Sequence, residues 1–276
     1  MPLQLKHTSD RNENGHFAPP PSFRVLDVPV NAVQIPDVIA QIQLWIVSKA
    51  KGRYIAVTSM HGIAESRSDG EYMLALNFAD MVVPDGMPLV WLGRWYGHAL
   101  KRRVYGPELM ETFCRETGGA YRHFFYGGNT GVADHLADSL RQRYGVVVAG
   151  TYTPPFRPLN KEEQREVASK VRKAAPDILW VGLSTPKQEK WIHRNRGELQ
   201  VPVMLGVGAA FDFNCGRVRQ APVWMRENGM EWLFRLVTEP KRLWRRYLVT
   251  IPKAAALVLL ELAGFLPRSR KPLLST

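Results

Sequence analysis

The chain has 276 residues, 45% of them hydrophobic and 22% charged, which are ordinary values for a globular protein and exclude global disorder, a collagen-like repeat and a polytopic membrane protein. Its two cysteines, Cys114 and Cys215, are too few for a disulfide-dense scaffold or a four-cysteine zinc site. The formal net charge is +12, and residues 217–276 hold 12 basic and 4 acidic residues, so most of the excess positive charge lies at the C-terminal end.

The first 22 residues are expected to form a flexible leader. This segment is polar, ends in Pro19-Pro20-Pro21 and lacks the apolar core of a signal peptide. No run of 18 or more apolar residues occurs in the chain, so we expect no membrane-spanning helix. The sequence therefore predicts a cytoplasmic protein whose cysteines are reduced.

Between residues 23 and 216, short apolar segments alternate with longer segments of helical periodicity. The expected strands are Phe23–Val28, Arg53–Thr58, Met81–Val83, Arg122–Tyr126, Val146–Gly150, Asp177–Leu183 and Val201–Val207. Several are apolar throughout, as expected for strands covered on both faces. We therefore predict an α/β catalytic domain over residues 23–216, in which a largely parallel, Rossmann-like sheet is flanked by helices. In such folds ligands bind at the carboxyl ends of the strands.

Several helices have recognisable start signals. The residues expected to precede helices are Asn31, Thr130, Asn160 and Thr185. Thr185 is followed by Pro186, which predicts an N-cap with proline at the first helical position.

Residues 217–276 are expected to form a basic, helical, membrane-proximal appendage. Ala221–Tyr247 has a helical pattern rich in tryptophan and arginine, and the largely apolar run Ala254–Leu266 follows it. This run is too short to span a bilayer but could lie among lipid headgroups, and the positive charge suits an anionic membrane surface. The alternative is a helical hairpin packed on the sheet with a solvated basic face.

The segment Val82–Gly86 places a carboxylate directly after an expected strand. Asp85 could act as a general base if it reached a substrate hydroxyl. The alternative is that Pro84-Asp85-Gly86 is only a favourable turn sequence. The sequence alone leaves both interpretations open.

Three further loops follow expected strands and contain small or polar residues. In Phe124–Gly131, glycines precede a helix and could admit a phosphate to its N-terminus, although neither a full G-x-G-x-x-G nor a P-loop pattern is present. In Gly182–Trp191, Lys187 and Gln188 open a helix and could reach a ligand. In Gly206–Asp212, small residues could admit a group close to the backbone. Tight turns, a solvated first helical turn and close packing are the alternatives.

Other enzyme chemistries lack their motifs. No Gly-x-Ser-x-Gly, His-Glu-x-x-His or Asp-x-Asp sequence occurs, and the seven histidines are scattered. Many sugar-nucleotide enzymes hold a divalent metal with Asp-x-Asp. We therefore expect neither a metal site nor a cofactor.

Five ordered segments resemble the WecG/TagA/CpsF family of bacterial glycosyltransferases, and the resemblance runs from about Phe23 to Tyr247. The segments are Ala79–Gly86, Arg103–Met110, Pro186–Trp191, Gly206–Asp212 with Ala221-Pro222, and Glu231–Leu236 with Glu239–Arg242. The resemblance implies an inverting, metal-independent transfer of a sugar from a UDP donor to a sugar linked to undecaprenyl pyrophosphate. Such enzymes act at the cytoplasmic face of the membrane in making cell-surface polysaccharides.

The implied partners are a UDP-sugar, a polyprenyl-pyrophosphate-linked acceptor and the inner surface of the cell membrane, to which the protein would bind peripherally. The oligomeric state is left open, a homo-oligomer included. By the same resemblance, Asp85 matches the family's proposed catalytic base, Thr58 its active-site threonine and Gln188 its active-site glutamine.

The resemblance also implies that arginines of the appendage close over the donor diphosphate. These fall among Arg235, Arg242 and Arg245. The remaining residues expected to bind substrate are His61, Gly127, Gly128, Asn129, Lys187 and Gly208.

One departure from the family pattern bears on the donor. Many members have an asparagine shortly after the active-site threonine, whereas this chain reads Thr58-Ser59-Met60-His61. We therefore expect UDP-glucose or another UDP-hexose or N-acetylhexosamine donor, as in exopolysaccharide synthesis. The alternative is an N-acetylmannosaminyl or N-acetylmannosaminuronic acid transferase of teichoic acid or common-antigen type.

A basic nucleic-acid-binding protein is the alternative from a different class. The pI of about 9.9 and the interleaved arginines and tryptophans would suit it. However, the basic residues lie beside an apolar run and form no recognisable nucleic-acid module, so we expect no nucleic-acid partner. A dinucleotide-dependent dehydrogenase is disfavoured by the incomplete glycine pattern.

Overall fold

The computed structural model describes residues 20–218, 220–222, 224–225 and 229–265, without the side chains of residues 242, 243 and 245–247. Residues 1–19 of the expected leader and the end of the expected apolar run at Leu266 therefore lie outside the described residues.

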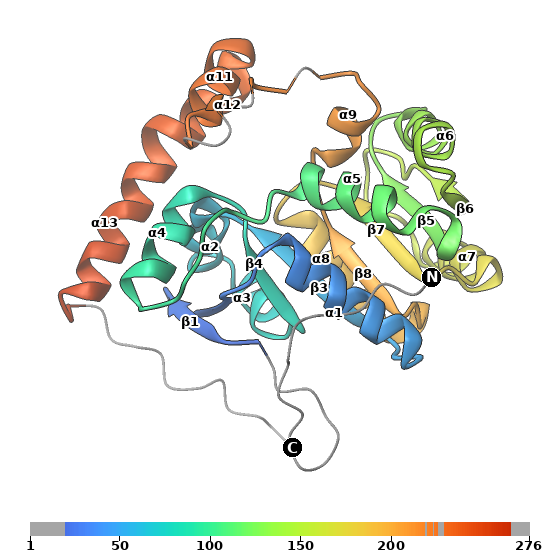
Figure 1. The fold of residues 1–276 in the computed structure, drawn as a ribbon, viewed down its shortest axis with the longest axis horizontal. Coiled ribbons are helices and arrows are strands. Elements are labelled where there is room, and N and C mark those ends of the chain that lie inside the picture. The colour runs from blue at the N-terminus through green and yellow to red at the C-terminus, as the bar shows by residue number, and fades with distance from the viewer. Residues whose placement is uncertain (1–19, 219, 223, 226–228, 266–276) are drawn as a thin grey trace.

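A six-stranded parallel sheet forms the centre of the molecule (Figure 1). Its strands are β3 (Arg53–Thr58), β4 (Met81–Pro84), β5 (Arg122–Gly127), β6 (Val147–Tyr152), β7 (Ile178–Gly182) and β8 (Val203–Gly206). Their order across the sheet is β4-β3-β8-β7-β5-β6, and every neighbouring pair is parallel. The α/β fold and six of the seven expected strands are confirmed.

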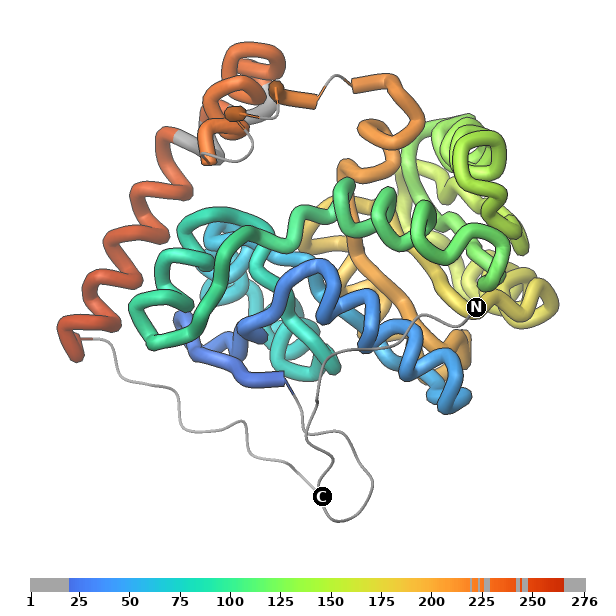
Figure 2. The backbone as a smooth tube through the Cα atoms, in the orientation of Figure 1, coloured from blue at the N-terminus to red at the C-terminus, as the bar shows by residue number. Residues whose placement is uncertain are grey.

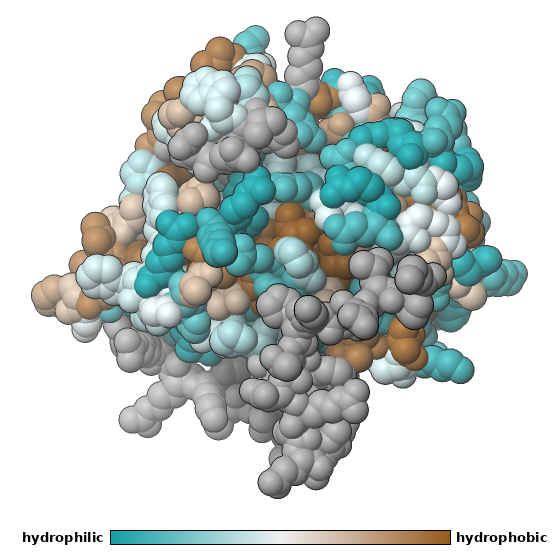
Figure 3. Space-filling view, in the orientation of Figure 1, coloured by the Kyte–Doolittle hydropathy of each residue, from teal (hydrophilic) through white to brown (hydrophobic). Residues whose placement is uncertain are grey.

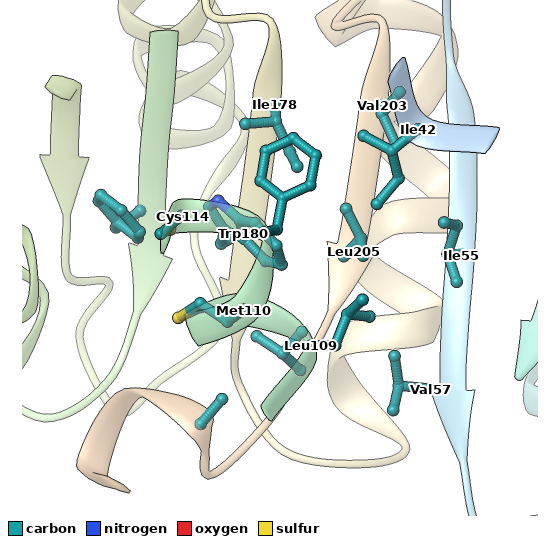
Figure 4. Close-up of a cluster of buried hydrophobic side chains, with 14 of the residues drawn as sticks. Ile42, Ile55, Val57, Leu109, Met110, Cys114, Ile178, Trp180, Val203 and Leu205 are labelled. Atoms are coloured by element: carbon teal, nitrogen blue, oxygen red, sulfur yellow. The ribbon is translucent and has the colours of Figure 1, made fainter. Parts of the chain in front are cut away.

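Helices cover both faces of this sheet (Figure 2). The helices of the α/β part are α1 (Ile35–Val47), α2 (Met60–Ser66), α3 (Gly70–Asn77), α4 (Met87–Trp95), α5 (Gly106–Thr117), α6 (Val132–Tyr144), α7 (Lys161–Ala174), α8 (Lys187–Leu199) and α9 (Ala210–Asn214), with a 3-10 turn at Gly118–Ala120. On one face, apolar side chains of α1, α5, α6 and α9 pack around the fully buried Trp180. Figure 4 shows Ile42 from α1 and Met110 from α5 in this cluster.

The opposite face of the sheet packs against the remaining helices. Tyr54 and Phe124 face a cluster with α7 and α8, and Ala56 and Val82 face one with α2, α3 and α4. Because successive side chains of a strand point to opposite faces, strands covered on both sides must be apolar at every position. Most polar groups are therefore found where the strands end; His123 of β5 is a buried exception, and its Nδ1 atom accepts a hydrogen bond from Trp180 Nε1 (3.0 Å).

The prediction of a single strand at Phe23–Val28 is wrong. Residues 22–31 form a separate antiparallel hairpin of β1 (Ser22–Val25) and β2 (Val28–Asn31) rather than one strand of the sheet. Its two-residue turn, Leu26 and Asp27, has φ angles of 47° and 69°. The turn contains no glycine or asparagine, the residues that would have predicted it from the sequence.

Three expected helix starts are also placed differently. Asn31 ends β2, and its side chain accepts a hydrogen bond from the Val82 backbone (2.8 Å), tying the hairpin to β4; Gln34 precedes α1 instead. Gly131, not Thr130, precedes α6, and Pro186, not Thr185, precedes α8. Asn160 is confirmed as the N-cap of α7, where it forms a reciprocal capping box with Glu163.

The appendage is helical and returns along the α4 side of the molecule (Figure 1). Its helices are α11 (Glu231–Thr238), α12 (Pro240–Arg245), a π-helical turn η2 (Arg246–Thr250) and α13 (Ile251–Leu262). In α13, Ala254 and Val258 are buried in the cluster that includes the hairpin and α2. The Glu261 carboxylate accepts hydrogen bonds from the Leu26 backbone N–H at 2.9 and 3.1 Å, so the last helix holds the unannounced turn.

The outer face of α13 is apolar and exposed. Leu259 is 66% exposed and Phe265, just beyond the helix, is 77% exposed. Figure 3 shows hydrophobic residues at the edge of the molecule where α13 lies in Figure 1. Among the helices that the structure describes, none is long and apolar enough to cross a membrane.

Candidate active site

A pocket of about 820 Å³ lies at the carboxyl ends of β5, β6 and β7. It is lined by the loop after each of these strands and by the start of α8 and the loop after β8. Of the residues expected to bind substrate, it brings together Gly128, Asn129, Lys187 and Gly208. Its position agrees with the general rule for parallel α/β folds.

The glycines after β5 shape one wall of this pocket. Gly127 has φ +122°, and a Cβ atom there would lie 2.6 Å from the Gly182 carbonyl oxygen of β7. Gly128 has φ +75°, and its backbone N–H donates to the same carbonyl at 2.9 Å. Gly127 therefore allows close contact between two strand ends, while Gly128 reaches the pocket itself.

Aromatic rings form another wall. Tyr126 is stacked between Trp191 and Tyr152, with ring centroids 4.1 Å and 5.7 Å away. Tyr126 and Trp191 both line the pocket. Because Tyr126 is only 1% exposed, the half-buried Trp191 presents most of the aromatic surface beside the polar loops.

The pocket also suits an anionic group. The N-terminal ends of α6 and α8, each of 13 residues, begin in lining loops, and Lys187 lies in the first turn of α8. Helix N-termini and a lysine favour negative charge. Asp212 and Glu198 on other parts of the lining give the pocket mixed charge.

Gln188 is 2% exposed and connects this pocket to a buried polar cluster. Its side-chain oxygen accepts a hydrogen bond from the Gly208 N–H (2.8 Å), and its amide nitrogen donates to Glu189 Oε1 (2.9 Å). Thr185 donates its hydroxyl to the same oxygen (3.0 Å). The side chain of Gln188 is thus held in one orientation from both ends.

Glu189 is an unusual group for a protein interior. It is 1% exposed, and burial raises its pKa to about 7, against the opposing effect of the hydrogen bonds from Gln188 and Thr185. Its Oε2 atom has no hydrogen-bond partner among the described residues. Burial and the nearby Glu189 carboxyl also raise the pKa of the Tyr72 phenol.

Thr58 ends β3 and belongs to the same buried region. It is 1% exposed, and its hydroxyl lies 3.2 Å from the Tyr72 hydroxyl. A Cβ atom on Gly62 would lie 2.5 Å from the Thr58 hydroxyl, so α2 closes over this pair. The Thr58 side chain therefore faces the interior, whereas its backbone carbonyl faces the next loop.

Asp85 is half-buried in the loop between β4 and α4. Its backbone N–H donates to the Thr58 carbonyl oxygen (2.8 Å), which fixes the loop against β3. Gly86 precedes α4 with φ +148°, a conformation that glycine adopts readily. The carboxylate thus lies at the same edge of the sheet as the pocket, above β4 and β3 rather than β5–β7.

A buried charged group lies beside Asp85 that the sequence analysis did not assign to the site. The Arg103 guanidinium forms an ion pair with Glu231 of α11 and lies 4.2 Å above the Tyr105 ring. The Tyr105 hydroxyl donates to Glu231 Oε1 (2.8 Å). Burial and the Glu231 carboxylate raise the pKa of Tyr105.

The remaining expected residues are spread around the site. His61 lies in α2 with Nε2 3.7 Å from Glu65 Oε2. Arg235 of α11 lies over the Phe213 ring (5.5 Å) and 3.8 Å from Glu239. Arg242 and Arg245 lie in α12, but their side chains are outside the described residues.

The expected site therefore divides into two parts on one edge of the sheet. The pocket holds Gly128, Asn129, Lys187 and Gly208, while Asp85 and Thr58 lie above β4 and β3. The sequence analysis did not assign Arg103, Tyr105, Glu189 and Glu231 to the candidate site. All four lie in segments that carry the family resemblance, but no local pattern marks their buried contacts.

These features define an α/β enzyme with its site at the carboxyl edge of a parallel sheet. A model of the glycosyl transferase WecG/TagA/CpsF family matches residues 23–267. The chain therefore belongs to this family and is a glycosyltransferase.

The curated relatives carry a more specific name, N-acetylglucosaminyldiphosphoundecaprenol N-acetyl-beta-D-mannosaminyltransferase. The protein from Bacillus spizizenii is 29% identical over 238 residues, which cover 84% of this chain and 90% of the relative. The protein from Bacillus subtilis strain 168 is 30% identical over 194 residues, covering 70% and 73%. The protein from Staphylococcus aureus strain NCTC 8325 is 27% identical over 175 residues, covering 63% and 67%.

These names favour the N-acetylmannosaminyltransferase alternative over the expected UDP-hexose donor.

The close contact at Gly127 predicts a stability effect. Gly127→Ala should lower the free energy of unfolding by more than about 2 kcal/mol, because a side chain there is both conformationally strained and in contact with backbone atoms. Gly145→Ala is the matched control, since Gly145 has φ +69° and no atom within 4 Å of an added Cβ; it should cost about 1 kcal/mol. Urea denaturation measures both, and equal losses would contradict the role of Gly127.

Proposed function

We propose that this glycosyltransferase moves N-acetylmannosamine from a UDP donor to N-acetylglucosamine linked to undecaprenyl diphosphate. The observation that carries the proposal is the shared name of relatives that match up to 84% of the chain. The geometry supports it, because the pocket suits a planar base and a diphosphate while Asp85 supplies a carboxylate at the same edge. UDP-glucose is the second candidate donor, favoured because the chain reads Ser59-Met60-His61 after Thr58, where the family pattern has an asparagine.

In this proposal the reaction is a single displacement. The acceptor hydroxyl attacks C1 of the sugar, its proton passes to the Asp85 carboxylate, and the bond between C1 and the UDP oxygen breaks. A general base is needed because a sugar hydroxyl is a weak nucleophile at neutral pH. The charge that develops on the diphosphate is stabilised by helix N-termini, Lys187 and arginines of the appendage, without a metal ion.

The buried cluster has a positioning role in this mechanism. The Thr58 carbonyl holds the backbone of Asp85, and Gln188 holds Gly208 at the pocket wall. Thr58 and Gln188 thus connect the part of the site that holds the base to the part that holds the donor. They need not touch the reacting atoms to affect turnover.

The lipid-linked acceptor also implies a location. We propose that the chain binds peripherally to the cytoplasmic face of the cell membrane, through the basic appendage and its apolar outer surface. Trp224 and Trp244 are 57% and 45% exposed, and tryptophan is favoured at membrane interfaces. The buried side of α13 holds this surface in place on the α/β part.

The direct test is a donor panel. The full chain is incubated with UDP-N-acetylmannosamine, UDP-N-acetylglucosamine or UDP-glucose, together with N-acetylglucosamine on a short-chain prenyl diphosphate, and disaccharide formation is measured with and without EDTA. We expect product from UDP-N-acetylmannosamine that EDTA does not reduce. Product from UDP-glucose alone would favour the second donor. The absence of product from every donor, or loss of activity in EDTA that magnesium restores, would contradict the proposal.

Asp85→Asn should retain the fold and donor binding but lower kcat by about 10²–10⁴, the usual contribution of a general base. Disaccharide formation measures turnover, and a thermal shift with UDP measures donor binding. Asp134→Asn is the matched control, because Asp134 is an exposed carboxylate on α6 that accepts a hydrogen bond from the Thr151 hydroxyl. Wild-type turnover in a folded Asp85→Asn variant would remove Asp85 from the mechanism.

The double variant Leu259→Ser, Phe265→Ser should bind vesicles of anionic phospholipid about 10-fold or more weakly, because it removes two large apolar side chains from the exposed surface of α13. Substitution is preferable to truncation here, since Ala254 and Val258 on the same helix are buried. Val47→Ser, at the 74% exposed Val47 of α1, is the control and should bind normally. Equal vesicle binding by all three proteins in a cosedimentation assay would contradict the proposed surface.

A further inference from the structure

Arg103 interacts electrostatically with two carboxylates that belong to different parts of the chain. Asp85 follows β4 in the α/β part, and Glu231 opens α11 of the appendage. Val104, next to Arg103, donates its backbone N–H to the Pro84 carbonyl at 2.8 Å, so the loop that carries Arg103 is attached directly beside Asp85. The side chain of Arg103 reaches from this point to the ion pair with Glu231.

Glu231 is atypical of the appendage. Residues 217–276 contain 4 acidic and 12 basic residues, and Glu231 is only 5% exposed. Its two carboxylate oxygens accept hydrogen bonds from Arg103 and from the Tyr105 hydroxyl. A carboxylate is rarely buried unless it is paired in this way. The appendage therefore docks on the α/β part through a negative charge that is directed at Arg103.

Both carboxylates affect the pKa of the Arg103 guanidinium. Burial lowers the pKa of the Arg103 guanidinium, but Asp85 and Glu231 together outweigh this and raise it overall. Further from Asp85, Phe213 packs edge-on against Tyr105 (6.3 Å), and Arg235 over Phe213 pairs with Glu239. In the part of the chain that the structure describes, the charged and titratable groups that interact with Arg103 include Asp85, Tyr105 and Glu231, with Arg235 and Glu239 behind Phe213.

We propose that Glu231 is a positioning residue that draws Arg103 toward the appendage and so leaves the Asp85 carboxylate able to accept the proton of the acceptor hydroxyl. When the appendage is docked, Arg103 divides its interaction between the two carboxylates. When Glu231 is absent, Arg103 pairs with Asp85 alone, which stabilises the carboxylate as an anion and makes it a weaker base. Docking of the appendage therefore also activates Asp85 as a base. The inference rests on the proposed function, in which Asp85 is the base.

The alternative is that Glu231 only anchors the appendage. The two roles differ in the pH dependence of turnover. An anchor changes how much protein is active but leaves the titration of the base where it was. A residue that acts through Arg103 moves the acidic limb of the kcat–pH profile, because that limb reports the protonation of Asp85 in the substrate complex.

The experiment measures disaccharide formation at saturating donor and acceptor over pH 5–9. Glu231→Gln removes the charge but keeps an acceptor oxygen. We expect its acidic limb to move to lower pH by on the order of one unit, with a fall in plateau kcat and little change in the KM for the donor. Tyr105→Phe is the matched control: it removes the other hydrogen bond to Glu231 without changing a charge, and its limb should stay at the wild-type position.

Arg103→Gln gives the second arm. Removal of the cation should move the limb to higher pH, and Glu231→Gln in the Arg103→Gln background should move it no further. Two results would overturn the inference. The first is an acidic limb at the wild-type position in Glu231→Gln. The second is a shift between Arg103→Gln and the double variant as large as the shift that Glu231→Gln causes alone. Circular dichroism and protection of the α11 amides from hydrogen exchange establish that each variant is folded and docked.

If the appendage of the Glu231→Gln variant does not dock on the α/β part, the Glu231→Asp variant is measured in its place. This variant keeps the charge, so its limb should stay near the wild-type position while Arg103→Gln still raises it. A limb that does not respond to Arg103→Gln would then overturn the inference. If the wild-type protein forms no disaccharide from any UDP-sugar, the proposed function itself fails; normal wild-type turnover with unresponsive limbs contradicts only the role of Glu231.

Discussion

Burial of both faces of the parallel sheet is the constraint on which the rest of this molecule depends. Strands such as β7 and β8 are apolar at almost every position because helices cover them on each side. An unpaired polar group placed there would lose its hydration without compensation. Chemistry is consequently restricted to the loops at the carboxyl ends of the strands. The pocket and Asp85 both lie at this edge although long segments of chain separate them.

At this edge, polar side chains that enter the interior are held by hydrogen-bond partners on neighbouring helices and loops. Gln188 is fixed between Gly208 and Glu189, and Thr58 is fixed against Tyr72 beneath α2. Such networks limit each side chain to one orientation, which is what a binding or catalytic loop needs from its support. The loops themselves can then carry exposed groups such as Lys187 without losing their shape.

The appendage is also held by buried polar contacts. It contacts the α/β part at two distant places, through Glu231 near Asp85 and through Glu261 at the hairpin turn. Both contacts use a carboxylate within a strongly basic segment. Two of the four acidic residues of this segment therefore attach it to the α/β part, whereas the exposed surface of its described residues is largely basic and apolar. This division agrees with a surface that meets an anionic membrane while the site lies behind it.

The sequence by itself predicted the α/β class, the six strands of the parallel sheet and the strand-end loops that hold Asp85, Gly128 and Lys187, because burial on both faces leaves apolar runs that end in polar loops. It did not reveal the hairpin turn at Leu26, whose backbone N–H donates to the Glu261 carboxylate from the far end of the chain. Nor did it reveal the partnership of Arg103 with Glu231. Ion pairs between residues more than a hundred positions apart leave no local signal, since their energy exists only once the fold has brought both charges out of water and into contact. Those contacts were decided by the tertiary structure alone.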